Sequence, residues 1–319
     1  MLRATFVLAA VLLLSVVMHA QQSAAGPPVT VTKLKDSVYW VRGGGGSNDG
    51  VGSNNGFIVG KMGVIVVDTK TTADVEKLVI AEIAKVTPKP VDAVILTHSD
   101  EDHVGGLPAF PMGRRIIAQE NSKNDMERAA KLGFEPCVGC RTLGLLTPSQ
   151  DRLPTETFEK KKELNIDGVR IRLYHWAPGH TSGDTVVYLP DKKFVFAGDL
   201  LVNTRPDPLI HTEKNGSAAG WIENAREMLG LDADTYLTGH GTVMSKDDLR
   251  QKLELVQDKY KKVKDMVAQG KTLEEVKISF GLPTGLAGAT TEPPAVILIE
   301  VMYKEASGTP PAAGDFRRE

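Results

Sequence analysis

Residues 97–106 of the chain, with the sequence THSDEDHVGG, place two histidines and three acidic residues within the six positions 98–103. The stretch directly follows the apolar run 94–96, so the polar cluster is predicted to lie where a buried strand ends. A buried carboxylate without a partner costs on the order of several kcal/mol, and a nearby cation normally offsets that cost. No Lys or Arg lies within the cluster itself. The stretch therefore predicts a metal site, with Asp and His ligands that suit zinc, manganese or iron.

Three later segments repeat the pattern of a predicted strand followed by a residue that can bind metal. These residues are His180 after a strand at 168–175, Asp199 at the end of a hairpin at 185–199, and His240 after a strand at 235–238. Ligands at the ends of neighbouring strands gather at one edge of a sheet. The sequence thus predicts that four distant segments form one site.

Hydrophobic periodicity gives the other expected elements. Runs rich in β-formers predict further strands at 29–42 (two short strands), 57–60, 64–68, 92–96 and 115–118. Helical spacing predicts helices at 74–85, capped by Thr72 or Asp74, and at 122–132, 218–229, 245–269, 273–280 and 294–306. Residues 133–160 are expected to be irregular. Strand, helix and strand in this order indicate an α/β layer arrangement.

Taken together, the motifs resemble those of the metallo-β-lactamase fold superfamily. The resemblance covers most of residues 29–245 and rests on five motifs in order. They are Asp68, the 98–103 cluster, Pro178-Gly-His180-Thr-x-Gly-Asp184, Gly198-Asp199 and Gly239-His240-Gly241. The resemblance implies a four-layer αββα sandwich with extra C-terminal helices, and metal ligands in a shallow groove at the sheet edges.

The resemblance also implies a set of site residues around two divalent metal ions. The first ion would take His98, Asp100 and His180, the second would take Asp102, His103 and His240, and Asp199 would bridge them. Asp102 and Asp199 are the expected catalytic residues, and Asp68, Thr181 and Asp184 are expected to orient ligands without binding metal. Zinc is the expected metal, and a metal-bound hydroxide would be the nucleophile.

One residue departs from the pattern of the resembled family. That pattern is His-x-His-x-Asp-His, whereas this chain has Asp100 in place of the second histidine. Three ligating carboxylates and a hydroxide would cancel the charge of two divalent ions, and a less positive centre acidifies water less. We therefore hypothesise a first site that is weaker for zinc, or that accepts manganese or iron.

The expected activity is hydrolysis of an ester-like bond, which could be a β-lactam, lactone, thioester, phosphodiester or sulfate ester. By the resemblance, a bridging Asp199 is typical of thioesterase, lactonase, phosphodiesterase and alkylsulfatase-like members. A β-lactamase proper, or a non-hydrolytic di-iron redox or binding protein on the same fold, remains an alternative. Candidate substrate-binding residues are Asn55, Arg205, His211 and Lys214. For the loop that holds His211, a surface role and a substrate-facing role both stay open.

The N-terminus has the composition of an export signal. An apolar run spans 6–18 after Arg3, and small residues follow, which predicts a signal peptide over 1–25, cleaved after Ala20 or Ala25. An uncleaved anchor is the alternative, but the run is shorter than the roughly 20 residues that a membrane-spanning helix needs. We therefore expect a periplasmic or secreted protein without stable membrane association after cleavage.

Three further segments complete the expected organisation. They are a metallo-β-lactamase-fold domain over 26–245, a helical extension over 246–306 packed on the same domain, and a disordered tail over 307–319. The 38 basic residues nearly balance the 40 acidic ones, so we expect a small-molecule substrate and no nucleic acid. The pattern leaves open the oligomeric state, and whether Cys137 and Cys140 form a disulfide or a functional thiol pair.

Overall fold

The computed structural model of the chain describes residues 28–45, 52–132, 152–283 and 294–308. The predicted signal peptide, both cysteines and most of the predicted tail lie outside the described residues. Among the described helices, none combines the length and hydrophobicity that a membrane span requires.

Seven strands form the first sheet, and their spatial order is the same as their order in the chain. They are β1 (Val29–Lys35), β2 (Val38–Gly43), β3 (Asn55–Val59), β4 (Val64–Val67), β5 (Val91–Ile95), β6 (Arg115–Gln119) and β7 (Glu156–Phe158). Neighbours from β1 to β4 are antiparallel, and neighbours from β4 to β7 are parallel. Every residue of β4 is buried, as expected of a continuous apolar strand covered on both faces.

The second sheet has six strands in the spatial order β13-β12-β11-β10-β9-β8. They are β8 (Lys161–Ile166), β9 (Val169–Tyr174), β10 (Val186–Leu189), β11 (Phe194–Val202), β12 (Thr235–His240) and β13 (Met244–Ser245). All neighbouring pairs are antiparallel except β11 and β12.

All described helices but one short one occur where helical periodicity predicts them. The described helices are α2 (Ala73–Val86), α3 (Glu101–Val104), α4 (Glu120–Leu132), α5 (Ala218–Gly230), α6 (Lys246–Ala268), α7 (Leu273–Ser279) and α8 (Pro294–Ser307). Thr72 is the cap of α2, where its side chain accepts a hydrogen bond from the backbone N–H of Val75. The short α3 was not predicted, because four residues carry no helical period.

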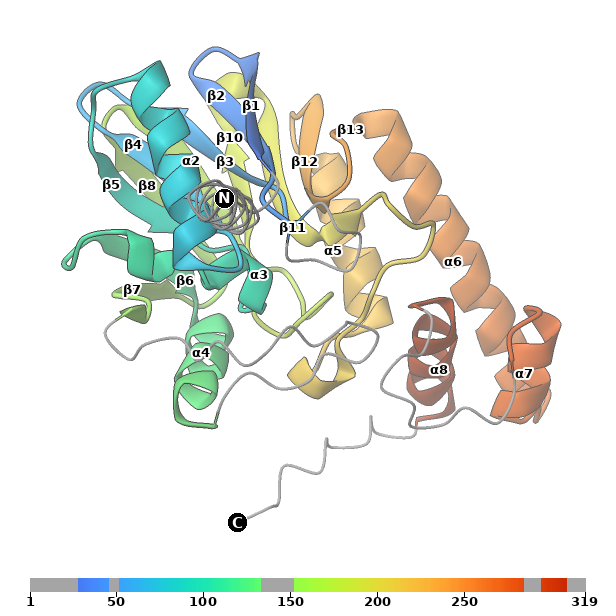
Figure 1. The fold of residues 1–319 in the computed structure, drawn as a ribbon. Helices are drawn as coiled ribbons and strands as arrows, with labels where there is room; N and C mark the ends of the chain where they lie inside the picture. The colour runs from blue at the N-terminus through green and yellow to red at the C-terminus, as the bar shows by residue number, and fades with distance from the viewer. Residues whose placement is uncertain (1–27, 46–51, 133–151, 284–293, 309–319) are drawn as a thin grey trace, which may run out of the picture.

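Three hydrophobic clusters define four layers. One cluster lies between the sheets and joins side chains such as Ile65 and Ile95 of the first to Leu173 and Phe196 of the second. A second cluster joins the other face of the first sheet to α2 and α4, and a third joins the second sheet to α5, α6 and α8. The sheets therefore stack face to face with helices on both outer sides, as Figure 1 shows. The predicted αββα sandwich with additional C-terminal helices is confirmed.

Two strand predictions were wrong in detail. The segment predicted to be irregular contains β7, and the lysine-rich residues after it form β8. β8 lies at the edge of its sheet, and Lys162 occupies one of its three inward positions, so only Leu164 and Ile166 give a period-two signal. Asp199 lies within β11 and not at its end, because the strand continues to Val202 with register shifts on both sides of Gly198.

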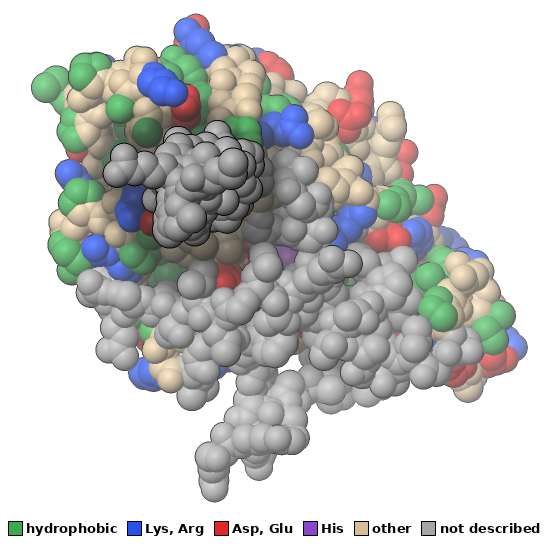
Figure 2. Space-filling model, in the orientation of Figure 1, with side chains coloured by type: hydrophobic (Ala, Val, Ile, Leu, Met, Phe, Trp, Pro, Cys, Tyr) green, Lys and Arg blue, Asp and Glu red, His purple; other side chains and the backbone are tan. Residues whose placement is uncertain are grey.

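The outer surface of the described residues mixes charges of both signs. Figure 2 shows basic and acidic side chains interspersed on the face seen in Figure 1. This distribution agrees with the nearly balanced composition of the chain.

Glu305 of α8 attaches the C-terminal helix to the start of α5. Its carboxylate accepts hydrogen bonds from the Ser217 hydroxyl (2.8 Å), the backbone N–H groups of Ala218 (2.9 Å) and Ala219 (3.1 Å), and the Tyr260 hydroxyl (2.9 Å). The first N–H groups of a helix have no partner within the helix, and the local dipole favours a negative charge there. Glu305 thus supplies hydrogen-bond acceptors to the first N–H groups of α5, although it lies 86 to 87 residues away in the chain.

We predict that Glu305→Ala lowers the free energy of unfolding by roughly 1 to 3 kcal/mol, because hydrogen bonds to a charged group are lost. Urea unfolding followed by circular dichroism measures the change. Glu274→Ala, at an exposed position in the first turn of α7, is the control and should leave the stability nearly unchanged. Equal stability of the two variants would contradict the role given to Glu305.

Candidate metal centre

The Asp68 carboxylate connects the segments that carry the predicted ligands. Its Oδ1 accepts from the backbone N–H of Thr97 (2.7 Å), and its Oδ2 accepts from the Thr97 hydroxyl (2.6 Å) and from Nδ1 of His103 (3.0 Å). Asp68 follows β4 with a left-handed backbone (φ 58°), a conformation that Asp tolerates better than most residues. Asp68 therefore holds Thr97, which follows β5, and His103 of the cluster in fixed positions at the same time.

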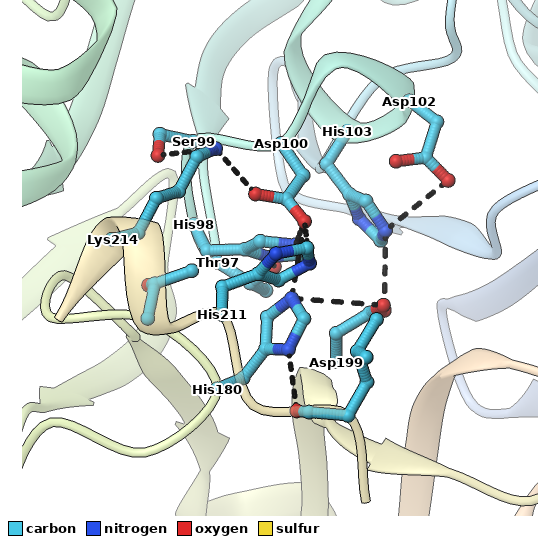
Figure 3. Close-up of polar contacts among 12 residues, drawn as sticks. Thr97, His98, Ser99, Asp100, Asp102, His103, His180, Asp199, His211 and Lys214 are labelled. Carbon is cyan, nitrogen blue, oxygen red and sulfur yellow. Dashed lines mark hydrogen bonds and ion pairs between the residues drawn. The ribbon is translucent and has the colours of Figure 1, made fainter. Parts of the chain in front are cut away.

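The predicted ligands form two adjacent groups. His98, His180 and Asp199 form the first, and Asp102, His103 and His240 form the second. Within each group, one ligand atom from each residue lies within 4.8 Å of the others. Both groups lie where β5, β11 and β12 and the loop after β9 meet, so four distant segments converge. Figure 3 shows His98, His103, His180 and Asp199 directed at one another.

Asp199 faces both groups. Its Oδ1 lies 3.2 Å from Nε2 of His103, while its Oδ2 lies 3.4 Å from Nε2 of His240 and 3.9 Å from Nε2 of His180. Burial would raise the pKa of Asp199, but His240 and His103 hold it well below its usual value. The carboxylate is therefore ionised at neutral pH and stands between the two groups.

The histidines are oriented through their Nδ1 atoms. Nδ1 of His180 donates to the backbone carbonyl of Leu209 (2.9 Å), and Nδ1 of His103 donates to Asp68. Nδ1 of His98 lies 2.9 Å from the Thr97 hydroxyl, whose proton is already donated to Asp68, so the Thr97 oxygen accepts. Each Nε2 consequently points toward the centre, as metal-binding histidines usually do.

Glycines allow the close approach of the segments. A Cβ at Gly239 would lie 1.8 Å from Oδ1 of Asp199, and a Cβ at Gly198 would lie 2.3 Å from the Thr97 hydroxyl oxygen. Gly198 also has a positive φ (53°). The motifs Gly198-Asp199 and Gly239-His240 therefore need glycine because a side chain would displace Asp199 or Thr97.

Hydrogen bonds within the loop that carries His180 stabilise its conformation. The Asp184 carboxylate accepts from the Thr181 hydroxyl (2.6 Å), the Thr181 backbone N–H (3.0 Å) and the Gly179 backbone N–H (3.1 Å). Thr181 and Asp184 thus stabilise the loop on which His180 lies.

Asp100 has partners that the sequence did not associate with it. Its Oδ1 accepts from the ammonium of Lys214 (2.5 Å), and its Oδ2 lies 3.1 Å from Nε2 of His180 and 3.2 Å from Nε2 of His211. Burial would raise the pKa of Asp100, but Lys214 and His211 hold it well below its usual value. The cation that the six-residue cluster lacks is thus supplied by the 3-10 helix η4 (Thr212–Lys214), more than 100 residues later.

Carboxylates also control the protonation of the buried histidines. Burial lowers the pKa of His103, but Asp102, Asp199 and Asp68 raise it well above its usual value. Likewise, Asp100 and Glu213 outweigh burial and raise the pKa of His211 to about 10. The raised pKa of His103 favours its protonated ring, so metal binding at this nitrogen has to displace a proton and becomes weaker at low pH.

The four predicted substrate-binding residues lie in three different places. His211 and Lys214 lie beside Asp100, as described above. Asn55 is buried and donates to the backbone carbonyl of Asp68 (3.4 Å). Arg205 lines a surface depression beside α6, together with residues such as Asn203 and Lys252. The Glu213 carboxylate, which accepts from Nδ1 of His211, was missed, and only its position two residues along the chain could have suggested it.

The residues fit divalent metal ions. Nε2 of His98, Nε2 of His103 and Oδ1 of Asp199 are buried and make no hydrogen bond of good geometry with the described residues, although Nε2 of His103 and Oδ1 of Asp199 face each other at 3.2 Å. Buried polar atoms without a hydrogen bond are rare in folded proteins, and three converging ones indicate a ligand. Imidazole and carboxylate donors suit zinc, manganese and iron.

Comparison with known proteins agrees with this geometry. Residues 48–240 match the family model of the metallo-beta-lactamase superfamily. The chain belongs to this superfamily. The matched residues include the 98–103 cluster, His180, Asp199 and His240, so the predicted family is confirmed.

Curated relatives within the superfamily have differing activities. The chain is 25% identical over 266 residues to a linear primary-alkylsulfatase of Pseudomonas sp. (strain ATCC 19151), covering 72% of this chain and 50% of that protein. It is 30% identical over 200 residues to the 2,4-dinitroanisole O-demethylase subunit alpha of Nocardioides sp. (strain JS1661), covering 62% and 55%. The chain spans about half the length of these two relatives.

A solved metallo-beta-lactamase from Pontibacter korlensis has the same fold. It aligns with a TM-score of 0.59 at 22% identity, covering 72% of this chain and 99% of that chain. At this identity, the likeness shows the fold alone.

We predict that Asp68→Asn weakens metal binding roughly 10- to 100-fold, because the amide nitrogen cannot accept from Thr97 or His103. Competition with a chromophoric chelator measures the affinity. Asp167→Asn is a matched control, since Asp167 also has a positive φ (55°) but lies in the turn between β8 and β9. Wild-type affinity in the Asp68 variant would show that this carboxylate does not orient the ligands.

Proposed function

We propose that the protein is a dinuclear metal-dependent hydrolase that cleaves an ester-like bond of a small molecule. The observation that carries this proposal is the Asp199 carboxylate, which lies between two groups of potential metal ligands and approaches His103 and His240 of one group and His180 of the other. Membership of the superfamily supports the same conclusion.

We assign the chain's residues to the ions as the sequence predicts. His98, Asp100 and His180 would hold the first ion, while Asp102, His103 and His240 would hold the second, with Asp199 between them. Two bound divalent ions lower the pKa of water and polarise the bond under attack. Zinc is the metal we expect, and the carboxylate at position 100 makes manganese or iron the alternatives.

Asp102 is suited to proton transfer at the mouth of the site. Its side chain is 21% exposed, against 14% for Asp100 and 6% for Asp199. Burial raises the pKa of Asp102, but His103 and His240 lower it below its usual value, so the carboxylate is ionised at neutral pH. Its Oδ2 lies 3.1 Å from Nε2 of His240. We assign Asp102 to binding the second ion and to accepting a proton from water or the leaving group.

The relatives suggest which substrate classes should be tested first. The alkylsulfatase relative covers 72% of this chain, which supports testing sulfate esters first. The demethylase relative adds aryl methyl ethers to the bonds worth testing. Lactones, thioesters, phosphodiesters and β-lactams complete the set of bonds that such a centre can attack.

We predict that the protein hydrolyses at least one of these classes only when loaded with metal. Chelation should abolish turnover, and zinc, manganese or iron should restore it to different extents. Asp199→Asn should lower kcat/KM roughly 100-fold or more, because an interaction of several kcal/mol with the ions is lost. A panel of chromogenic substrates measures the rates.

Asp191→Asn serves as the control, because Asp191 forms an exposed ion pair with Arg170 away from the centre. It should leave turnover unchanged. A protein that holds two ions and turns over none of the panel would refute the hydrolase proposal. Visible absorption from bound iron together with redox activity would favour the di-iron alternative.

We also propose that the protein is exported, on the basis of the apolar run at 6–18 and the small residues that follow it. Expression in a Gram-negative bacterium should then give a periplasmic protein that begins at Gln21 or Gly26. N-terminal sequencing of the recovered protein tests this, and an intact N-terminus in the cytoplasm would contradict it.

A further inference from the structure

We propose that His211 is a ligand of the first metal ion and supplies the imidazole that Asp100 has replaced in the motif. The proposal rests on the proposed function, since it concerns the same two-metal centre. It adds a ligand from the loop after β11, a segment outside the five motifs. The first site would then hold His98, His180 and His211, with Asp100 as its carboxylate.

Distances to Asp100 place His211 with the other imidazoles. Oδ2 of Asp100 lies 3.2 Å from Nε2 of His211, 3.1 Å from Nε2 of His180 and 3.5 Å from Nε2 of His98. His211, His180 and Asp100 form a third group whose ligand atoms all lie within 4.8 Å of one another. Three imidazoles thus converge on one carboxylate oxygen (Figure 3).

The three imidazole rings also pack against one another, with His180 in the middle. The rings of His180 and His211 are 4.5 Å apart and nearly perpendicular (76°), and those of His98 and His180 are 4.9 Å apart at 84°. The His211 side chain is only 1% exposed. His211 is therefore an inner residue of the centre, where it is too buried to serve as a surface contact for substrate.

His211 is oriented in the same way as the predicted ligands. Its Nδ1 donates to the Glu213 carboxylate, just as Nδ1 of His103 donates to Asp68 and Nδ1 of His180 donates to the Leu209 carbonyl. A carboxylate on the far nitrogen fixes the ring and makes the near nitrogen a better donor to a metal. A histidine that only neutralised Asp100 would not need this second partner.

The backbone holds His211 against the loop that carries His180. The N–H of His211 donates to the His180 carbonyl (2.9 Å), and the His211 carbonyl accepts from the N–H groups of Gly216 (2.8 Å) and Lys214 (3.1 Å). Gly216 is required there, because a Cβ would lie 2.3 Å from the His180 carbonyl oxygen. His180 and His211 are consequently fixed relative to each other before any ion binds.

Lys214 explains how Asp100 can share the site with three imidazoles. Its ammonium contacts Oδ1 of Asp100 (2.5 Å) and the Ser99 hydroxyl (3.3 Å), which leaves Oδ2 directed at the histidines. The ammonium also offsets one carboxylate charge, so the first site keeps the character of a three-histidine site. Asp100 then lies between Lys214 and the ion.

Cobalt(II) is the probe for the test, because its visible absorption changes with the number and type of its ligands. The metal-free full chain is titrated with cobalt, and equilibrium dialysis gives the amount bound. We expect the wild type to bind two ions. His211→Ala should bind one ion normally and the other at least roughly tenfold more weakly, with altered absorption. His175→Ala, which removes a histidine outside the three groups, should behave as the wild type.

A second variant gives a positive signal. In His211→Cys, a thiolate at position 211 should bind cobalt and produce an intense near-ultraviolet sulfur-to-cobalt absorption, which His175→Cys should lack. This readout does not depend on the loss of binding, so it holds even if His211→Ala folds poorly. Circular dichroism checks the fold of each variant.

The two proposals fail in different ways. Wild-type cobalt affinity and absorption in His211→Ala, together with no sulfur band in folded His211→Cys, would overturn the ligand assignment. That result would leave the hydrolase proposal standing. Wild-type protein that binds two ions but hydrolyses no substrate would instead refute the proposed function, and the cobalt titrations would still decide the role of His211.

Discussion

The centre depends on one buried carboxylate, that of Asp68. This carboxylate accepts hydrogen bonds from Thr97, the residue directly before His98, and from Nδ1 of His103. These two histidines belong to different ligand groups, so a single side chain sets the spacing of the two candidate metal sites. Their rings lie 4.2 Å apart. Because Asp68 follows β4 and Thr97 follows β5, the parallel pairing of these strands is transmitted directly to the ligands.

Much of the fold, and the motifs that carry the candidate metal ligands, could be predicted from the sequence. The motifs around His98, His180, Asp199 and His240 are local, and each is recognisable from a few neighbouring residues. The strands and helices that carry them also have strong periodicity. β8 was missed because lysines on an edge strand resemble a solvated loop.

The contacts of Asp100 could not be predicted in this way. Lys214 and His211 are more than 100 residues away in the chain, and only the packing of η4 against the cluster brings them together. A count of charges within residues 98–103 finds three carboxylates and no cation, whereas the folded site includes an ammonium. The charge of a site is a property of its surroundings in space, and a motif contains only part of it.

Glu305 has a consequence for anyone who shortens this protein. The residues that match the family model end at 240, and a chain trimmed to that boundary would still contain all seven metal ligands predicted from the sequence. It would lack Glu305, which secures Ser217 and the first turn of α5, directly after the segment with His211 and Lys214. The family boundary is therefore a poor guide to the smallest functional unit. A shortened form of this chain should therefore retain α8.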